Sequence, residues 1–156
     1  MTARSAQHGT IRLERRYKAA PARVFAAWAE PEARAKWDVP GRWVIAEQTF
    51  DFREGGHERK RFGPRDDPRF LAEKVYRDIV ADRRIVFSYA MTARDVPIST
   101  SLTTVEFAPD GQAPHKGTRL LLVEQIVFFD GNDNVANREE GLSSMLDKIG
   151  EWLLAG

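Results

Sequence analysis

The segment that decides the fold is Asn137–Ala155 at the C-terminus, which reads NREEGLSSMLDKIGEWLLA. Its apolar residues recur every three to four positions, a spacing that places them on one face of an α-helix. Asn137 is expected to cap this helix, with Glu140 completing a capping box. The apolar face must be buried, so the helix is expected to lie against the rest of the protein. The residues on this face are Leu142, Met145, Leu146, Ile149, Trp152 and Leu153.

The chain before this helix predicts one strand, two short helices and then about six strands. The first strand is Thr10–Tyr17, and the helices are Pro21–Ala29 and Pro31–Trp37, each with a proline at its first position. Strands that follow one another through short loops pair in an antiparallel manner, so the fold class is α+β. The later strands are expected at Trp43–Arg53, His57–Phe62, Phe70–Val80, Arg84–Met91, Ile98–Phe107 and Thr118–Phe129.

This order of elements predicts a curved antiparallel sheet of six or seven strands wrapped around one long C-terminal helix. The helix is the only substantial cover for the sheet, so the sheet must bend around it to bury the apolar face. A bent sheet that grips a helix tends to leave a cavity between the two, and such cavities bind small apolar molecules. The sequence therefore predicts where a ligand binds but does not identify the ligand.

Composition excludes several classes of function. The 156 residues fit one domain, expected at residues 10–156 after a flexible tail at residues 1–9. The 24 basic and 23 acidic residues nearly cancel and form no block of like charge, which argues against nucleic-acid binding. There is no cysteine and the three histidines are scattered, so we expect no metal and no cofactor. Without a signal peptide or a long apolar run, we expect a cytoplasmic protein that does not insert into membranes.

The hairpin in the middle of the chain predicts two inward-facing charges. A three-residue loop with a glycine bulge would pair Phe52 with Glu58 and Phe50 with Lys60. This register also brings Phe62 to the inner face. It therefore places a carboxylate and an ammonium among aromatic side chains.

Glu124 is the sharpest single candidate for a functional residue. If its side of the strand faces the helix, the carboxylate sits among apolar groups, where burial would raise its pKa and suit a general acid or a hydrogen-bond anchor. The structural alternative pairs it with Lys60 or Arg59. The opposite side of the strand is also apolar, so the facing stays open. We favour an unpaired Glu124 as the polar anchor of the cavity, with Glu58 and Lys60 nearby. The residues on its side are Leu120, Leu122, Glu124, Ile126 and Phe128.

The candidate ligand-binding set combines these polar groups with aromatic and apolar residues from every element. Aromatic side chains are mostly ordinary core, and the sequence does not separate core from cavity lining. No catalytic residue is assigned, because no nucleophile, base and orienting group occur in an organised pattern. The set is Trp28, Trp37, Phe50, Phe52, Glu58, Lys60, Phe62, Tyr76, Phe87, Tyr89, Leu122, Glu124 and Met145.

Several short motifs, taken in order, resemble one superfamily. They include residues Ala20–Trp28, Phe50–Gly56, Tyr76–Tyr89, Gly117–Leu120 and Arg138–Gly141. Over about residues 10–155 the chain resembles START-like proteins, also called the SRPBCC or helix-grip superfamily. Within it, the chain is similar to the branch related to the C-terminal domain of the heat-shock-protein-90 ATPase activator. The resemblance implies a helix-grip fold with a hydrophobic cavity and supplies no shared catalytic triad.

Three functions are compatible with these observations. The first is a non-enzymatic carrier or sensor of a small hydrophobic molecule, favoured because no catalytic constellation is visible. The second is a cyclase- or hydrolase-type enzyme that uses Glu124, with Glu58 and Lys60. The third is a protein-interaction or co-chaperone-like module, which would need an exposed apolar patch. The expected partner is the small hydrophobic molecule, and the sequence leaves a homodimer open.

Overall fold

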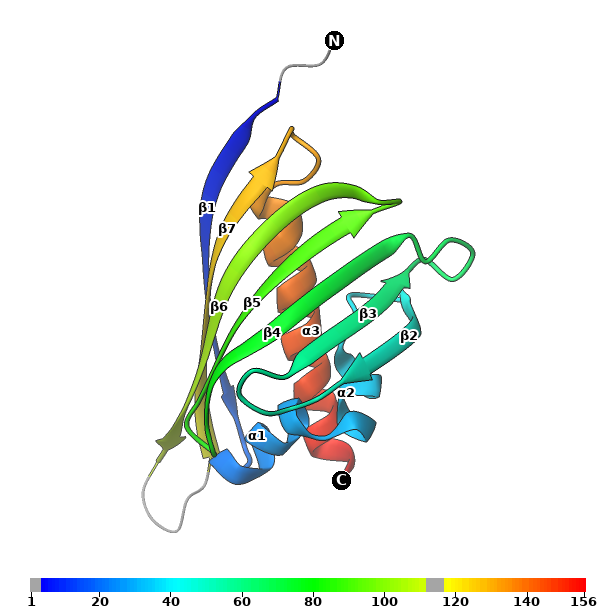
Figure 1. The fold of residues 1–156 in the computed structure, drawn as a ribbon. Coiled ribbons are helices and arrows are strands. Elements are labelled where there is room, and N and C mark those ends of the chain that lie inside the picture. Colours follow the sequence, from blue (N-terminus) through cyan, green and yellow to red (C-terminus); the bar gives the residue numbers. More distant parts are fainter. Residues whose placement is uncertain (1–3, 112–116) are drawn as a thin grey trace.

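The computed structural model describes residues 4–111 and 117–156, which form a seven-stranded sheet and three helices (Figure 1). The predicted order of one strand, two short helices, further strands and a long helix is confirmed. The elements are β1 (Ala6–Tyr17), α1 (Pro21–Ala29), α2 (Pro31–Trp37), β2 (Val44–Phe50), β3 (His57–Gly63), β4 (Phe70–Val80), β5 (Arg84–Ala93), β6 (Val96–Asp110), β7 (Gly117–Phe129) and α3 (Val135–Ala155).

The strands form one open, curved sheet in the order β1-β7-β6-β5-β4-β3-β2, and every neighbouring pair is antiparallel. Only β1 lies out of chain order, because α1 and α2 separate it from the strands that follow. The helices lie along one side of the curved sheet (Figure 1). We call the side of the sheet that faces the helices the inner face. The α+β class and the curved sheet are therefore confirmed.

The first strand begins earlier than the sequence analysis expected. It starts at Ala6 instead of Thr10 and pairs with β7 along its whole length, from Ala6 opposite Phe129 to Tyr17 opposite Thr118. The residues at its start are mostly polar and show no alternation of apolar side chains, so no pattern in the sequence indicated a strand there. They pair through the backbone alone, because an edge strand pairs on only one side. Residues 6–9 therefore belong to the sheet.

The long helix α3 begins at Val135, two residues before the predicted start. Its cap is Asn134, in an extended conformation, whose side chain accepts a hydrogen bond of 2.9 Å from the backbone N–H of Asn137. The prediction that Asn137 itself is the cap was wrong, because two asparagines three residues apart offer the same local signal.

The predicted apolar face of α3 packs onto the core. Leu142, Leu146 and Ile149 are buried, while Met145 and Trp152 are half-buried against the same cluster. Trp152 lies toward the surface, where the Arg23 guanidinium stands 4.2 Å from its ring centre. The helix therefore buries a stripe centred on Leu146 and Ile149.

The β2–β3 hairpin has a different register from the predicted one. Phe50 pairs with Glu58, and Gln48 pairs with Lys60, so the connecting loop is longer than three residues. A Cβ atom on Gly56 would stand 2.1 Å from the carbonyl oxygen of Asp51, so this loop requires glycine there. The register moved by two residues, and a two-residue shift keeps every side chain on its face. Glu58 and Lys60 are therefore buried on the inner face, as predicted.

Candidate functional site

A group of buried charged and polar side chains lies between α2 and the sheet. We call it the Arg34 cluster. Arg34 and Asp38 come from α2 and its C-terminal cap, and inner-face residues of the sheet meet them from three strands. Because Arg34 and Asp38 are four residues apart, these two charges lie one turn apart on the same side of the helix. The other members are Gln48 on β2, Glu58 and Lys60 on β3, and Lys74 and Tyr76 on β4.

Arg34 is the centre of this cluster. Its guanidinium donates hydrogen bonds to Asp38 at 2.7 and 3.2 Å and to Glu58 at 2.6 Å. It also donates to the hydroxyl of Tyr76 at 2.9 Å and to the carbonyl of Trp28 at 3.3 Å. These bonds use all three nitrogens of the guanidinium, which is the requirement for burying a charge.

Glu58 and Lys60 complete the cluster from β3. Glu58 also accepts a 2.5 Å hydrogen bond from the hydroxyl of Tyr76. The ammonium of Lys60 donates to the carbonyl oxygen of Asp38 at 2.5 Å and lies 3.2 Å from its carboxylate. Gln48 donates to Asp38 at 3.0 Å. Both carboxylates are thus held by several donors.

The pKa values in the cluster follow from burial opposed by neighbouring charge. Burial alone would raise the pKa of Asp38 and Glu58, but the Arg34 guanidinium and the ammonium groups of Lys60 and Lys74 together more than offset it. The pKa of Glu58 falls to about 2, and that of Asp38 is held well below its ordinary value. Burial raises the pKa of Tyr76. At neutral pH both carboxylates are therefore ionised acceptors and cannot act as general acids.

A second buried polar group surrounds Glu124. The carboxylate is 1% exposed and accepts hydrogen bonds from Tyr89 at 2.8 Å and Thr103 at 2.8 Å. Ser101 donates at 3.4 Å, and the Arg138 guanidinium of α3 donates at 3.1 Å. Glu124 therefore faces inward, which settles the facing that the sequence left open. The expectation of an unpaired carboxylate was wrong, because Arg138 supplies a cation that the sequence analysis did not consider.

Arg138 joins α3 to the sheet. Besides Glu124, it donates to the hydroxyl of Ser99 at 2.7 Å and to Asp133 at 3.4 Å. Burial alone would lower the pKa of Arg138, but Tyr89 and Glu124 raise it, so it stays charged. An ion pair between a helix and a strand of this kind fixes their relative position.

The two polar groups are separate, although Glu58 and Lys60 were expected beside Glu124. Among the described residues, no hydrogen bond or ion pair joins the two groups. Tyr89 lies between them, with the ammonium of Lys74 and the guanidinium of Arg138 each 5.9 Å from the centre of its ring. The sheet thus carries one polar centre near its β2 edge and another on β6 and β7.

The remaining residues of the predicted set pack mainly against one another. Trp28 and Trp37 lie 4.7 Å apart between ring centres, and Phe52 contacts Tyr76 edge-on at 5.0 Å. Such pairs are typical of a packed core. In the core cluster, Trp28, Trp37, Tyr76, Phe87 and Leu122 are buried, Phe50, Phe52, Tyr89 and Met145 are half-buried, and Phe62 is buried in a smaller cluster with Val39 and Ala72.

A hollow of about 600 Å³ opens between α2, β2 and α3, and we call it the β2 hollow. Residues 44–48 and Phe50 line it from β2, and Val39 and Trp43 line it from the preceding loop. The remaining walls come from α2 and from Lys148 of α3, whose ammonium donates to the carbonyls of Val39 and Gly41 at 2.7 and 2.6 Å. Phe50 is the member of the predicted set that lines this hollow. The residues from α2 are Pro31, Ala35 and Lys36.

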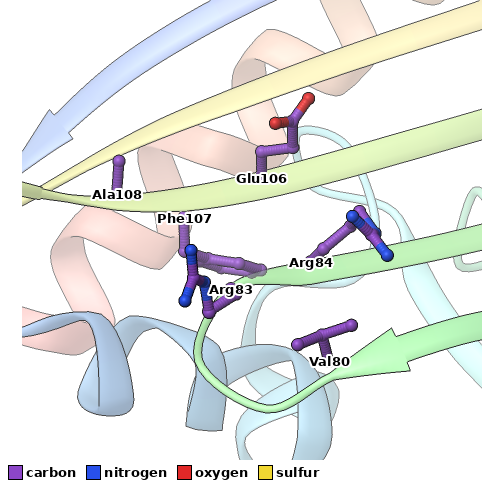
Figure 2. A pocket seen from close by; sticks show the side chains of 6 residues that line it. All are labelled: Val80, Arg83, Arg84, Glu106, Phe107 and Ala108. Carbon is purple, nitrogen blue, oxygen red and sulfur yellow. The ribbon is translucent and has the colours of Figure 1, made fainter.

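A smaller hollow of about 390 Å³ lies at the turn between β4 and β5, beside β6 (Figure 2). Val80, Arg83, Arg84, Glu106, Phe107 and Ala108 line it. Arg84 is already bound to the Asp78 carboxylate at 2.6 Å, and the pKa of Arg84 is raised by that bond. Its lining is mostly exposed side chains, so this hollow is a shallow part of the surface.

Four charged residues of these groups were not among the predicted site residues: Arg34, Asp38, Lys74 and Arg138. Arg34 and Asp38 stand at positions i and i+4 around a short helix, a spacing that signals an ion pair. A polar stripe at Ser99, Ser101 and Thr103 in β6 signalled a polar patch opposite Glu124. No such signal marked Lys74 or Arg138, because their main partners, Glu58 and Glu124, belong to other elements. The pairs emerge only from the tertiary fold.

A model of the family described as "Activator of Hsp90 ATPase homolog 1-like protein" matches residues 18–153. The chain belongs to this family. Its START-like fold agrees with the resemblance noted from the motifs. Among curated proteins, no match was found.

Several solved structures share the fold over nearly the whole chain. An uncharacterised protein from Rhizobium leguminosarum is 38% identical, with 99% of this chain and 100% of that chain covered and a TM-score of 0.89. The Mll3558 protein from Rhizobium loti is 44% identical over 94% of this chain and 98% of its own, with a TM-score of 0.84. The protein CV1439 from Chromobacterium violaceum is 26% identical over 92% of this chain and 96% of its own, with a TM-score of 0.78. These similarities establish the family and the fold but name no ligand.

Two further features of the described residues bear on partners. No helix in residues 4–111 or 117–156 is both long and apolar enough to cross a bilayer. In the same ranges, no group of three or more histidine, aspartate or glutamate side chains is placed to hold a metal ion.

Proposed function

We propose that this protein binds a small apolar molecule in the β2 hollow and acts as a carrier or sensor of it. The observation that carries the proposal is the hollow itself. Its volume of about 600 Å³ lies within the range of small-molecule sites, about 300–1,000 Å³. Val39, Trp43 and Phe50 provide an apolar lining, and Gln48 provides a polar group. A few polar groups in an apolar lining are typical of ligand sites.

The polar chemistry near the hollow supports binding over catalysis. Asp38 and Glu58 are ionised and already accept hydrogen bonds from Arg34 and Tyr76. Glu124, the carboxylate on which an enzymatic function would depend, is paired with Arg138. A general acid or base must itself be free to exchange a proton with the substrate and must lie within hydrogen-bonding reach of it. Carboxylates held in this way serve better to position α2 and α3 than to transfer protons.

The experiment fills the hollow with a large side chain. Ala35 is exposed on α2 and lines the hollow, so Ala35→Trp places an indole in the space without removing a core contact. Calorimetry with the neutral probe 2-naphthamide should show binding to the parent protein and at least about tenfold weaker binding to this variant. The matched control is Ala136→Trp, at an exposed position on α3 outside the hollow. Equal affinity in the parent and Ala35→Trp would contradict the proposal.

A further inference from the structure

Lys74 differs from the other cations of the Arg34 cluster. It lies on the inner face of β4, opposite Glu58 on β3 and Tyr89 on β5. Its ammonium is 3.8 Å from the nearer oxygen of Glu58, which is longer than a hydrogen bond. The ring centre of Phe87 is 4.1 Å away, and that of Tyr76 is 6.0 Å away. Among the described residues, no acceptor hydrogen-bonds to this ammonium, although it has three N–H donors.

The charges of the cluster do not balance. It contains three cations, Arg34, Lys60 and Lys74, and two carboxylates, Asp38 and Glu58, so the described residues leave one positive charge in excess. Arg34 and Lys60 hold both carboxylates at hydrogen-bonding distance. The excess charge therefore rests on Lys74. A buried ammonium without a hydrogen-bond acceptor is unfavourable, and it is relieved by loss of the proton or by arrival of an anion.

The surroundings of Lys74 remain accessible. Its side chain is 11% exposed, and Tyr89 and Met91 on the neighbouring strand are half-buried. Two residues further along the same strands, Tyr76 and Phe87 are buried. This part of the inner face therefore places the Lys74 ammonium beside the Tyr89 ring and Met91, while the Arg138 guanidinium lies at the hydroxyl end of Tyr89. An anion that fits there has an apolar body and one small charged group.

We propose that Lys74 binds the carboxylate of an apolar organic acid, at a site on the inner face of the sheet distinct from the β2 hollow. The acid supplies the negative charge that the Arg34 cluster lacks. Its carboxylate accepts the N–H donors that Lys74 does not use, and its apolar body contacts Tyr89 and Met91. This assignment goes beyond the proposed function, because it adds a second site and names the chemistry of its ligand.

The test compares two probes that differ only in charge, 2-naphthoate and its neutral isostere 2-naphthamide. Calorimetry is carried out at pH 7 on the folded parent, on Lys74→Met and on Ala35→Trp. Lys74→Met keeps the length and apolar volume of the side chain but removes the charge. We expect it to weaken 2-naphthoate binding at least about tenfold and to change 2-naphthamide binding less than about twofold. The exposed Lys18→Met has the same change in net charge and should change neither affinity.

The outcomes separate this site from the hollow. Unchanged 2-naphthoate affinity in Lys74→Met overturns the Lys74 site, whatever the hollow binds. Loss of 2-naphthoate binding in Ala35→Trp alone also overturns it, because the acid then occupies the hollow. Loss of 2-naphthoate binding in Lys74→Met alone supports the Lys74 site. This holds even if 2-naphthamide does not bind and the proposed function fails.

A second measurement applies to the parent protein and needs no variant to fold. Burial lowers the pKa of Lys74 from 10.5 to about 8, so the amine is mostly protonated at pH 7 and mostly neutral at pH 9. An anion that binds the protonated form must raise this pKa, and NMR of the Lys74 side chain should show the rise with 2-naphthoate but not with 2-naphthamide. An equal rise of this pKa with both probes, or no rise with 2-naphthoate, overturns the proposal. The charged and titratable groups facing Lys74 are Arg34, Asp38, Glu58, Lys60, Tyr76 and Tyr89.

Discussion

The substitution Glu58→Gln isolates the electrostatic role of the Arg34 cluster. Glutamine has nearly the same shape as glutamate, so the change removes one charge and leaves the packing almost intact. The side chain is 3% exposed and accepts hydrogen bonds of 2.6 Å from Arg34 and 2.5 Å from Tyr76. After the substitution, three buried cations would share the single carboxylate of Asp38. The variant should therefore be markedly less stable at neutral pH.

Two independent arguments give the size of the loss. The pKa of Glu58 falls from 4.5 to about 2 in the folded protein, which corresponds to about 3 kcal/mol of stability at neutral pH. Removing one partner of a buried ion pair typically costs about 3–5 kcal/mol. We therefore expect a loss of about 3–5 kcal/mol. This is a large fraction of the roughly 5–15 kcal/mol by which domains of this size are stable.

The assay is urea unfolding at pH 7, followed by tryptophan fluorescence and circular dichroism. A lower midpoint with an unchanged slope reports a loss of stability without a change in the surface exposed on unfolding. Asp78→Asn is the matched control, since it removes a carboxylate of a surface pair with Arg84, and such pairs contribute little. A Glu58→Gln variant within about 1 kcal/mol of the parent would refute the view that this carboxylate balances buried charge.

Two further predictions follow from the same charges. Glu124→Gln should lower the midpoint of urea unfolding and leave 2-naphthamide affinity unchanged, because Glu124 is paired with Arg138 away from the β2 hollow. Stability should fall as the pH drops from about 4.5 toward 2, because the lowered pKa values of Asp38 and Glu58 make the unfolded chain bind protons first. Stability should rise between pH 8 and 10, where the unfolded chain retains the proton that Lys74 loses, and Lys74→Met should reduce this rise. Urea midpoints measured across the pH range check both limbs.

Local patterns were sufficient to predict the elements and the faces they bury. The alternation of Leu122, Glu124 and Ile126 correctly placed the three on one side of β7, and the structure settles that this side faces the helices. The hairpin shows why faces are easier to predict than registers. Glu58 and Lys60 were placed on the correct face although their partners were wrong by two residues, because side chains alternate with a period of two.

The partners of the buried charges could not be predicted from local patterns. Arg34 and Glu58 are 24 residues apart and meet only when α2 lies over β3, and no local pattern in the sequence determines that position. Arg138 reaches Glu124 because α3 crosses the sheet at the level of that residue. An unpaired Glu124 was therefore a reasonable hypothesis from its own strand. It failed because the compensating cation lies in a different element.

The Arg34 cluster and the β2 hollow are physically connected, which gives the buried charges a role beyond stability. A buried ionic group is seldom more stabilising than apolar residues of the same size, but it tolerates few alternative positions. Arg34 must stand between Asp38 and Glu58, and this fixes α2 relative to β3. Gln48 belongs to both structures, since it donates to Asp38 and lines the hollow. The separation of α2 and β2, and hence the width of the hollow, is therefore set by these buried charges.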